Sequence, residues 1–318
     1  MRFWIAIALT LALGSLSMNI VNAAEPTVVS LGTATAGGGF PVYGDAFAAA
    51  IKAADPSLDV QPRNTKGSGE NIPLLEAGKL DIALVQGESA YEALSGISRP
   101  PANLKILTAM YSSPGMFVVK ANSPYKTIAD LKGKPIAFGA AGSGLVILAR
   151  YVLDGAGLDQ NKDFGAIFLE RAGDGPAMVE DGRVAALWGG GIGWPGFTAV
   201  AKAPGGARFI APTPEEITRI QTKHTFLRTI AVPPGTYPGQ DATITSVGSW
   251  SFVLARPDLD EAVAYRLAKA LHAAEADIAK RLPQASETTA RNTVAALPRA
   301  ELLHSGVARY FREAGLMP

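Results

Sequence analysis

VVSLGTATAGGGFPVYG, residues 28–44, begins as an apolar, strand-like run and opens into glycines at positions 32, 37, 38, 39 and 44. Because the helical run DAFAAAIKAA follows, we expect a helix over 44–54. This order of strand, loop and helix predicts an α/β unit. Unpaired N–H groups at the start of a helix favour an anion, and glycine lets the anion approach closely. Such turns also occur in α/β folds that bind no ligand, so the loop alone leaves both interpretations open.

The next segment repeats this order of elements. A strand over 58–62 is followed by TKGSGENIPLLEAGKLDIALVQGESAYEAL at 65–94. We expect Ser68 to be the N-cap of a short helix over 71–77, and 81–86 to be a strand buried on both faces of a parallel sheet. Open α/β sheets bind ligands at the C-terminal ends of their strands, so the polar residues there are candidates for binding.

A second group of units begins downstream. Strands are expected over 104–110 and 116–119. A further strand, over 136–139, leads into the loop AAGSG at 140–144 and then into a helical run. This second loop at a helix N-terminus predicts a second lobe that offers the same contact to an anion. The run TITSVGSWSFVL at 243–254 predicts a strand that returns to the first lobe.

The first 23 residues predict a secretory signal peptide. They contain one cation, Arg2, an apolar run over 3–16 and small residues at the end, and we expect cleavage after Ala23. The apolar run is shorter than the roughly 20 residues that span a bilayer. We therefore expect a periplasmic protein that does not span a membrane once it is processed.

The composition limits the partners. Arg2 accounts for the formal net charge of +1, so the processed chain is neutral, and it has no long basic block. Nucleic acid is therefore not expected as a partner. Because the chain has no cysteine, a disulfide, a cysteine-ligated metal, a thiol nucleophile and a lipid anchor at the cleavage site are excluded. We expect a monomer that binds small molecules and other proteins.

Several motifs together resemble one transporter family. They are GTATAGGGF (32–40), GSGEN (67–71), LEAGKLDIALVQGESAYEAL (75–94), DLKGKPIAFGAAGSG (130–144) and PPGTYPGQD (233–241). The chain is similar to the TAXI-type solute-binding subunits of tripartite ATP-independent periplasmic (TRAP) transporters over nearly all of its processed length.

The resemblance implies an α/β, type II periplasmic binding fold. Two lobes would be joined by a hinge, with residues 24–119 and 247–318 in lobe 1 and residues 120–246 in lobe 2. It also implies a cleft that closes on a small organic anion, such as a glutamate-like amino acid, a dicarboxylate or a keto acid. The chain departs from the family pattern at Ala34 and Ala36, and in the segment ALWGGGIGWPGF at 186–197. These departures concern the segments expected to contact the ligand, so the resemblance to the family implies the fold and the class of protein but does not identify the ligand.

The predicted ligand contacts come from loops and strand ends of both lobes. The alternative is structural for each: a tight turn for the glycines, helix caps for the polar residues, core packing for the tryptophans, and solvated charges for the ions. The predicted contacts are Thr33, Gly38, Gly39, Phe40, Ser68, Asn71, Gln86, Ser143, Gly144, Trp188 and Trp250. Trp194 is a further candidate for the wall of the cleft, and the possible charge partners are Arg63, Lys66 and Glu88.

The sequence gives little support for catalysis. The histidines at 224, 272 and 304 have no spacing suited to a metal, and no G-x-S-x-G motif is present. We expect no metal and no cofactor. The first interpretation is a binding protein that delivers its ligand to a TRAP-type permease. The alternatives are a binding protein of an ATP-driven importer, a partner that reports ligand to a membrane sensor, and a secreted enzyme that uses the glycine loop for a phosphorylated ligand or dinucleotide.

Overall fold

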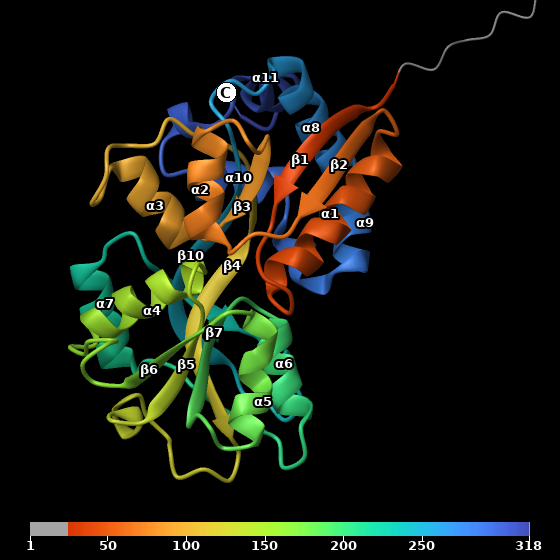
Figure 1. Ribbon diagram of the computed structural model, residues 1–318. Coiled ribbons are helices and arrows are strands. Elements are labelled where there is room, and N and C mark those ends of the chain that lie inside the picture. Colours follow the sequence, from red (N-terminus) through yellow and green to blue (C-terminus); the bar gives the residue numbers. More distant parts are fainter. Residues whose placement is uncertain (1–24, 318) are drawn as a thin grey trace, which may run out of the picture.

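The computed structural model describes residues 25–317, so the predicted signal peptide lies outside the described residues. Figure 1 shows an upper and a lower lobe joined by two long strands. The described residues form one ten-stranded sheet, in which eight strands follow the order β2-β1-β3-β10-β4-β7-β5-β6 from one lobe into the other, while β8 pairs with β4 and β9 with β10. The two lobes confirm the predicted α/β architecture.

Lobe 1 contains a parallel arrangement of short strands with helices after each of them. β1 pairs in parallel with both β2 and β3. The strands and helices are β1 (Thr27–Gly32), α1 (Gly39–Ala54), β2 (Leu58–Arg63), α2 (Ser68–Glu76), β3 (Ile82–Val85) and α3 (Gly87–Ser95).

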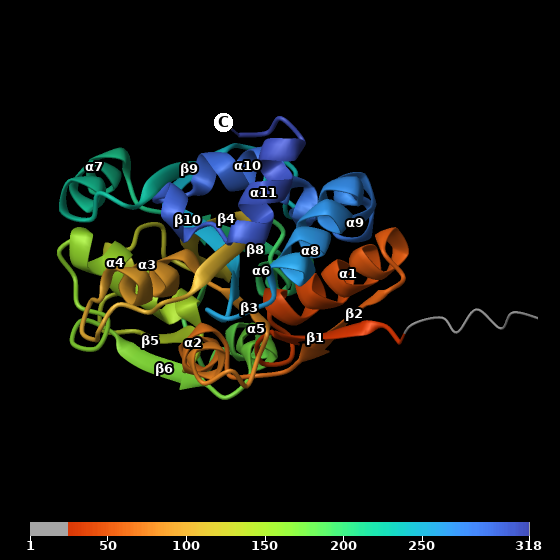
Figure 2. The same cartoon turned by 90° about the horizontal axis from the view of Figure 1, so that it is seen from above.

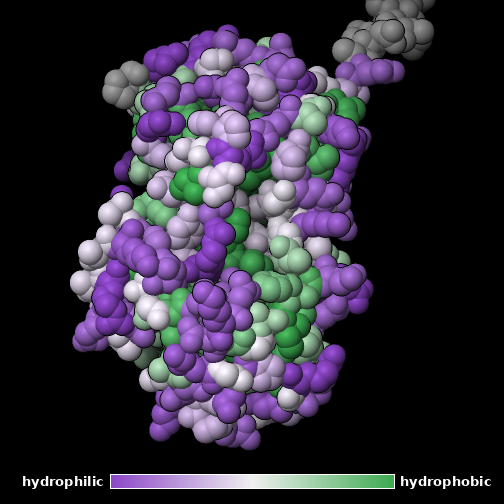
Figure 3. Space-filling view, turned by 60° about the vertical axis from the view of Figure 1, so that its left-hand side comes forward, coloured by the Kyte–Doolittle hydropathy of each residue, from purple (hydrophilic) through white to green (hydrophobic). Residues whose placement is uncertain are grey.

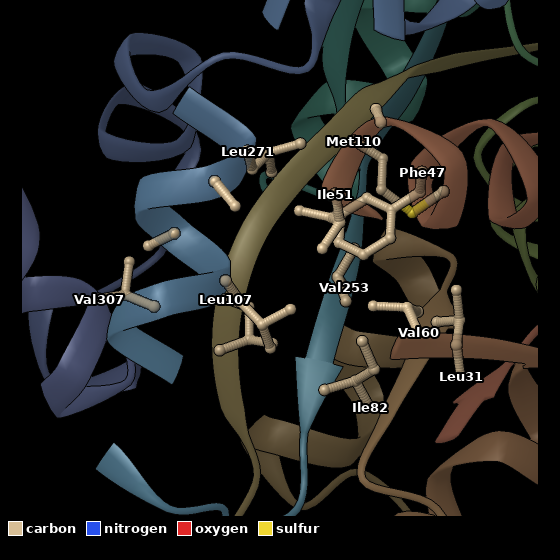
Figure 4. Close-up of a cluster of buried hydrophobic side chains, with 14 of the residues drawn as sticks. Leu31, Phe47, Ile51, Val60, Ile82, Leu107, Met110, Val253, Leu271 and Val307 are labelled. Carbon is tan, nitrogen blue, oxygen red and sulfur yellow. The ribbon is translucent and has the colours of Figure 1, made fainter. Parts of the chain in front are cut away.

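The C-terminal helices complete lobe 1. They are α8 (Glu261–Ala273), α9 (Glu275–Arg281), α10 (Ala290–Ala296) and α11 (Ser305–Glu313). Figure 2 shows α8 and α9 beside α1 on the outer face of the lobe. Side chains from α1, the strands and these helices meet in one apolar core, which includes Leu31, Phe47, Ile51, Ile82, Val253, Leu271 and Val307 (Figure 4).

Lobe 2 repeats the arrangement around a second core. β5 pairs in parallel with β6 and β7. The elements are β5 (Pro135–Ala140), α4 (Gly144–Gly155), β6 (Gly165–Leu169), α5 (Gly175–Glu180), β7 (Ala186–Gly190), α6 (Pro195–Lys202), β8 (Ala207–Ile210), α7 (Pro214–Lys223) and β9 (Arg228–Val232).

Two antiparallel strands, β4 (Lys105–Lys120) and β10 (Ile244–Ala255), pass between the lobes. β4 pairs with β10 as far as Pro114 and with β7 from Gly115 onward. β10 pairs with β9 up to Gly248 and with β3 from Phe252. The connection between the lobes therefore lies where the two strands exchange partners.

Three local predictions were wrong. The strands expected over 104–110 and 116–119 are one strand, because pairing of residues 112–114 with residues 248–250 and of Gly115 with Gly190 holds the Ser-Ser-Pro-Gly segment extended. The first helix begins at Gly39 rather than at residue 44. Ser68 is the first residue of its helix and not the N-cap, which is Gly67 with a φ of 106°. Only glycine adopts that φ readily, so the cap position is fixed by backbone conformation.

Candidate ligand-binding site

A cavity of about 40 Å³ lies between the lobes. Lobe 1 lines it with the glycine loop after β1, the loop before α2 and the end of β3, while lobe 2 contributes the loop after β5 and the end of β7. The lining residues are Ala34, Thr35, Gly38, Gly39, Phe40, Lys66, Gly67, Ser68, Gln86, Tyr111, Ser113, Ala140, Ser143, Gly144, Leu145, Ala172, Gly190 and Trp194.

Four helices begin at this cavity. α1 starts at Gly39 and α2 at Ser68, Gln86 is the N-cap of α3, and Ser143 is the N-cap of α4. All four of these residues line the cavity. Each helix directs the positive end of its dipole and its first N–H groups toward this region, so the arrangement favours an anion.

The serine hydroxyl groups at the cavity accept hydrogen bonds from backbone N–H groups, so their own protons stay free to donate to a ligand. Ser68 Oγ accepts a bond of 3.0 Å from the backbone N–H of Gln86. Ser143 Oγ accepts one of 3.2 Å from the N–H of Leu145. The Nε2 atom of Gln86, a residue only 3% exposed, has no partner among the described residues. Burial raises the pKa of Tyr111, so its hydroxyl also stays a donor. The polar wall is therefore rich in donors.

Two of the predicted ligand contacts, Thr33 and Asn71, do not line the cavity. Thr33 donates a 3.0 Å hydrogen bond to the carbonyl oxygen of Arg63. Asn71 Nδ2 donates 2.8 Å bonds to the carbonyl oxygens of Thr33 and Leu84. Both side chains therefore hold the ends of β1, β2 and β3 in place, and neither lines the cavity.

The tryptophans divide between core and cavity. Trp188 is fully buried in lobe 2, packs edge-on against Phe117 and donates a 2.8 Å bond to the carbonyl oxygen of Leu145. Trp250 packs on a lobe 1 core. Neither lines this cavity, whereas Trp194 at the N-cap of α6 does.

The predicted charge partners occupy different environments. Lys66 is exposed and lines the cavity, whereas Arg63 is exposed and does not. Glu88 is fully buried behind the lining, where its Oε1 accepts a 2.7 Å bond from Ser249 Oγ on β10. Burial raises the pKa of Glu88 to about 7, against the smaller opposing effect of the Ser249 hydrogen bond.

The lobes touch on both sides of the cavity. The N–H of Gly69 donates to the carbonyl oxygen of Gly142 at 3.1 Å, and that of Gly173 donates to Ala36 at 3.2 Å. At the edge, Arg150 of α4 pairs with Glu92 of α3. Figure 3 shows the upper and lower halves in contact across the waist on one face. The molecule is therefore in a closed arrangement.

Sequence reasoning missed several lining residues. Tyr111 and Ser113 lie inside the continuous strand β4, in the stretch that the sequence left between two predicted strands. Ala172 and Gly190 carry no polar side chain that could have identified them. Only the exchange of strand partners at Pro114 and Gly115 brings this part of β4 to the cavity.

The closed cavity between two α/β lobes defines the class as a two-lobed periplasmic binding fold. Residues 31–315 match the model of the NMT1-like family, and the chain belongs to that family. The chain is similar in structure to the periplasmic binding protein BugD, with a TM-score of 0.58 at 14% identity, covering 92% of this chain and 98% of that one.

Two further solved structures share the fold. A protein from Bordetella bronchiseptica RB50 has a TM-score of 0.57 at 16% identity, covering 91% of this chain and 98% of that one. Tv2483, solved bound to L-arginine, has a TM-score of 0.52 at 12% identity, covering 82% and 91%. These likenesses show the fold, while the TAXI and TRAP assignment stays a prediction.

Proposed function

We propose that this protein is a periplasmic solute-binding protein that captures a small organic anion and delivers it, unchanged, to a membrane transporter. The observation that supports this most is the meeting of four helix N-termini, from both lobes, at one closed cavity. The signal-peptide pattern before residue 24 supports the periplasmic location.

The transporter is proposed to be a TRAP-type permease, on the motifs that resemble TAXI-type subunits. An ATP-driven importer and a membrane sensor are the alternative partners. Among residues 25–317, no helix is long and apolar enough to cross a membrane. In that same part of the chain, no group of three or more histidine, cysteine or acidic side chains is placed to hold a metal.

Purified processed protein is expected to bind an organic anion at one molecule per chain and to leave it unchanged. Because a ligand that binds only the folded state stabilises it, the melting temperature should rise with ligand concentration. Thermal-shift screening of carboxylates, amino acids and keto acids identifies the ligand, and mass spectrometry after incubation checks its integrity. Conversion of the bound compound to a product would contradict a pure binding function.

The closed arrangement is proposed to open by a hinge at the partner exchange of β4 and β10, close to the predicted lobe boundaries at residues 119 and 246. Such hinges absorb a domain movement in a few residues. Small-angle X-ray scattering should therefore give a smaller radius of gyration with saturating ligand than without it. Identical scattering profiles in the two states would rule out closure on binding.

A further inference from the structure

We infer that the ligand of the cavity is a short-chain monoanion without an ammonium group, of the size of a two- to four-carbon monocarboxylate. This inference rests on the proposed function, since it narrows the class of organic anion that the same cavity accepts. Three independent observations carry it: the charges of the wall, the direction of its hydrogen-bonding groups, and its volume.

The charges of the wall exclude a zwitterion and a dianion. Lys66 is the one charged side chain that lines the cavity, and among residues 25–317 no aspartate or glutamate lines it. An amino acid would bury an ammonium group without a carboxylate partner, which is strongly unfavourable. Glu88 does not line the cavity, and its Oε1 accepts a hydrogen bond from Ser249. A second carboxylate would likewise lack a second cation.

The hydrogen-bonding groups point to the same ligand. Ser68 and Ser143 each use Oγ to accept a backbone N–H, which leaves their hydroxyl protons to donate. The buried Nε2 of Gln86 has no partner in the part of the chain that the structure describes, and an unmatched buried donor is costly. A carboxylate accepts hydrogen bonds only, so it satisfies these donors, whereas an ammonium group would compete with them.

The volume limits the length of the ligand. The centre of a water molecule can move within about 40 Å³ of the closed cavity, so the cavity is small and favours a short ligand. Main-chain contacts between the lobes, such as Gly69 to Gly142, set this width in the closed state. Phe40, Leu145 and Trp194 give the remaining wall an apolar character, which suits a short carbon chain.

Calorimetric titration with ligands of matched skeleton tests the inference. Propionate, lactate and pyruvate share a three-carbon chain with alanine, while succinate and glutamate add a second carboxylate. At least one of the first three is expected to bind at least tenfold more tightly than alanine, succinate and glutamate.

The outcomes separate this inference from the proposed function. Tighter binding of alanine, succinate or glutamate would overturn the inference and leave the proposed function standing, because an organic anion would still be captured. Binding of no compound in this set or in the wider screen of organic acids would overturn both.

A charge variant gives a second test. Lys66→Gln is expected to weaken binding of the preferred monocarboxylate about tenfold at low salt, and the difference should shrink as salt is added. Lys79→Gln is the control, because Lys79 is also exposed in lobe 1 but does not line the cavity. Equal affinities for the two variants would contradict the role of Lys66 and with it the charge argument.

Discussion

Glu88→Gln is expected to make the protein about 3 kcal/mol more stable at pH 8 and to leave its stability near pH 4.5 almost unchanged. The folded-state pKa of Glu88 is raised to about 7 by burial, compared with an ordinary value of 4.5. Between pH 4.5 and pH 7 the carboxyl group of Glu88 keeps its proton in the folded protein but has lost it in the unfolded chain. The free energy of unfolding therefore falls as pH rises through this range. About 2.5 pKa units correspond to about 3 kcal/mol. Because glutamine cannot ionise, the variant does not lose this part of its free energy of unfolding as pH rises.

Urea unfolding at a series of pH values gives the free energy of unfolding as a function of pH for Glu88→Gln and for the original protein. The difference between these two profiles measures the contribution of Glu88. Other titrating groups contribute equally to both proteins and cancel in that difference. Glu180→Gln is the control, because Glu180 is exposed and its replacement should change the free energy of unfolding little. Parallel profiles for the Glu88 variant and the original protein would show that Glu88 is not held protonated.

Gly144→Ala is expected to weaken ligand binding while leaving the melting temperature of the ligand-free protein nearly unchanged. A Cβ atom at this position would overlap the Cβ of Gln86 in the opposite lobe and would lie 2.8 Å from Ser89 Oγ. Because the two sides belong to different lobes, the clash can be relieved by opening the hinge. Overpacking of this kind costs about 1–3 kcal/mol, or roughly 5- to 150-fold in affinity.

Calorimetry with the identified ligand measures the loss, and small-angle scattering should show the variant more expanded than the original protein at saturating ligand. Gly165→Ala is the matched control. Gly165 is exposed on β6, and the nearest atom to an added Cβ there is 3.3 Å away and in the same lobe. Normal affinity of Gly144→Ala would mean that the binding state is more open than the structure described above.

The sequence predicted the parts of the fold that depend on local pattern. Glycine loops between apolar runs and helical runs located β1 and β5 with the helices that follow them, and the apolar run at 81–86 located β3, because turn and cap residues act over a few positions. The same logic selected Gly39, Ser68, Gln86 and Ser143, which the structure brings to one cavity. Their role in binding stays a prediction.

The sequence could not predict the positions of side chains that depend on contacts between distant parts of the chain. Trp188 is an aromatic residue in the middle of β7, and only the neighbouring strand and α4 determine that it faces the core. Glu88 follows the end of a strand, where a solvated side chain is the ordinary expectation. In the structure it is buried and accepts a hydrogen bond from Ser249, which is 161 residues away in the chain. Pairing over such separations has no local signal.

Both ends of the described chain belong to lobe 1, since β1 begins at Thr27 and α11 ends at Glu313 (Figure 1). Lobe 2 is therefore a loop of the chain, entered through β4 and left through β10. A tether at either terminus, whether to a sensor chip or to a bead, would hold lobe 1 still and leave lobe 2 free to swing. Pulling on the two termini would load lobe 1 directly, and force would reach lobe 2 only after lobe 1 had begun to unravel.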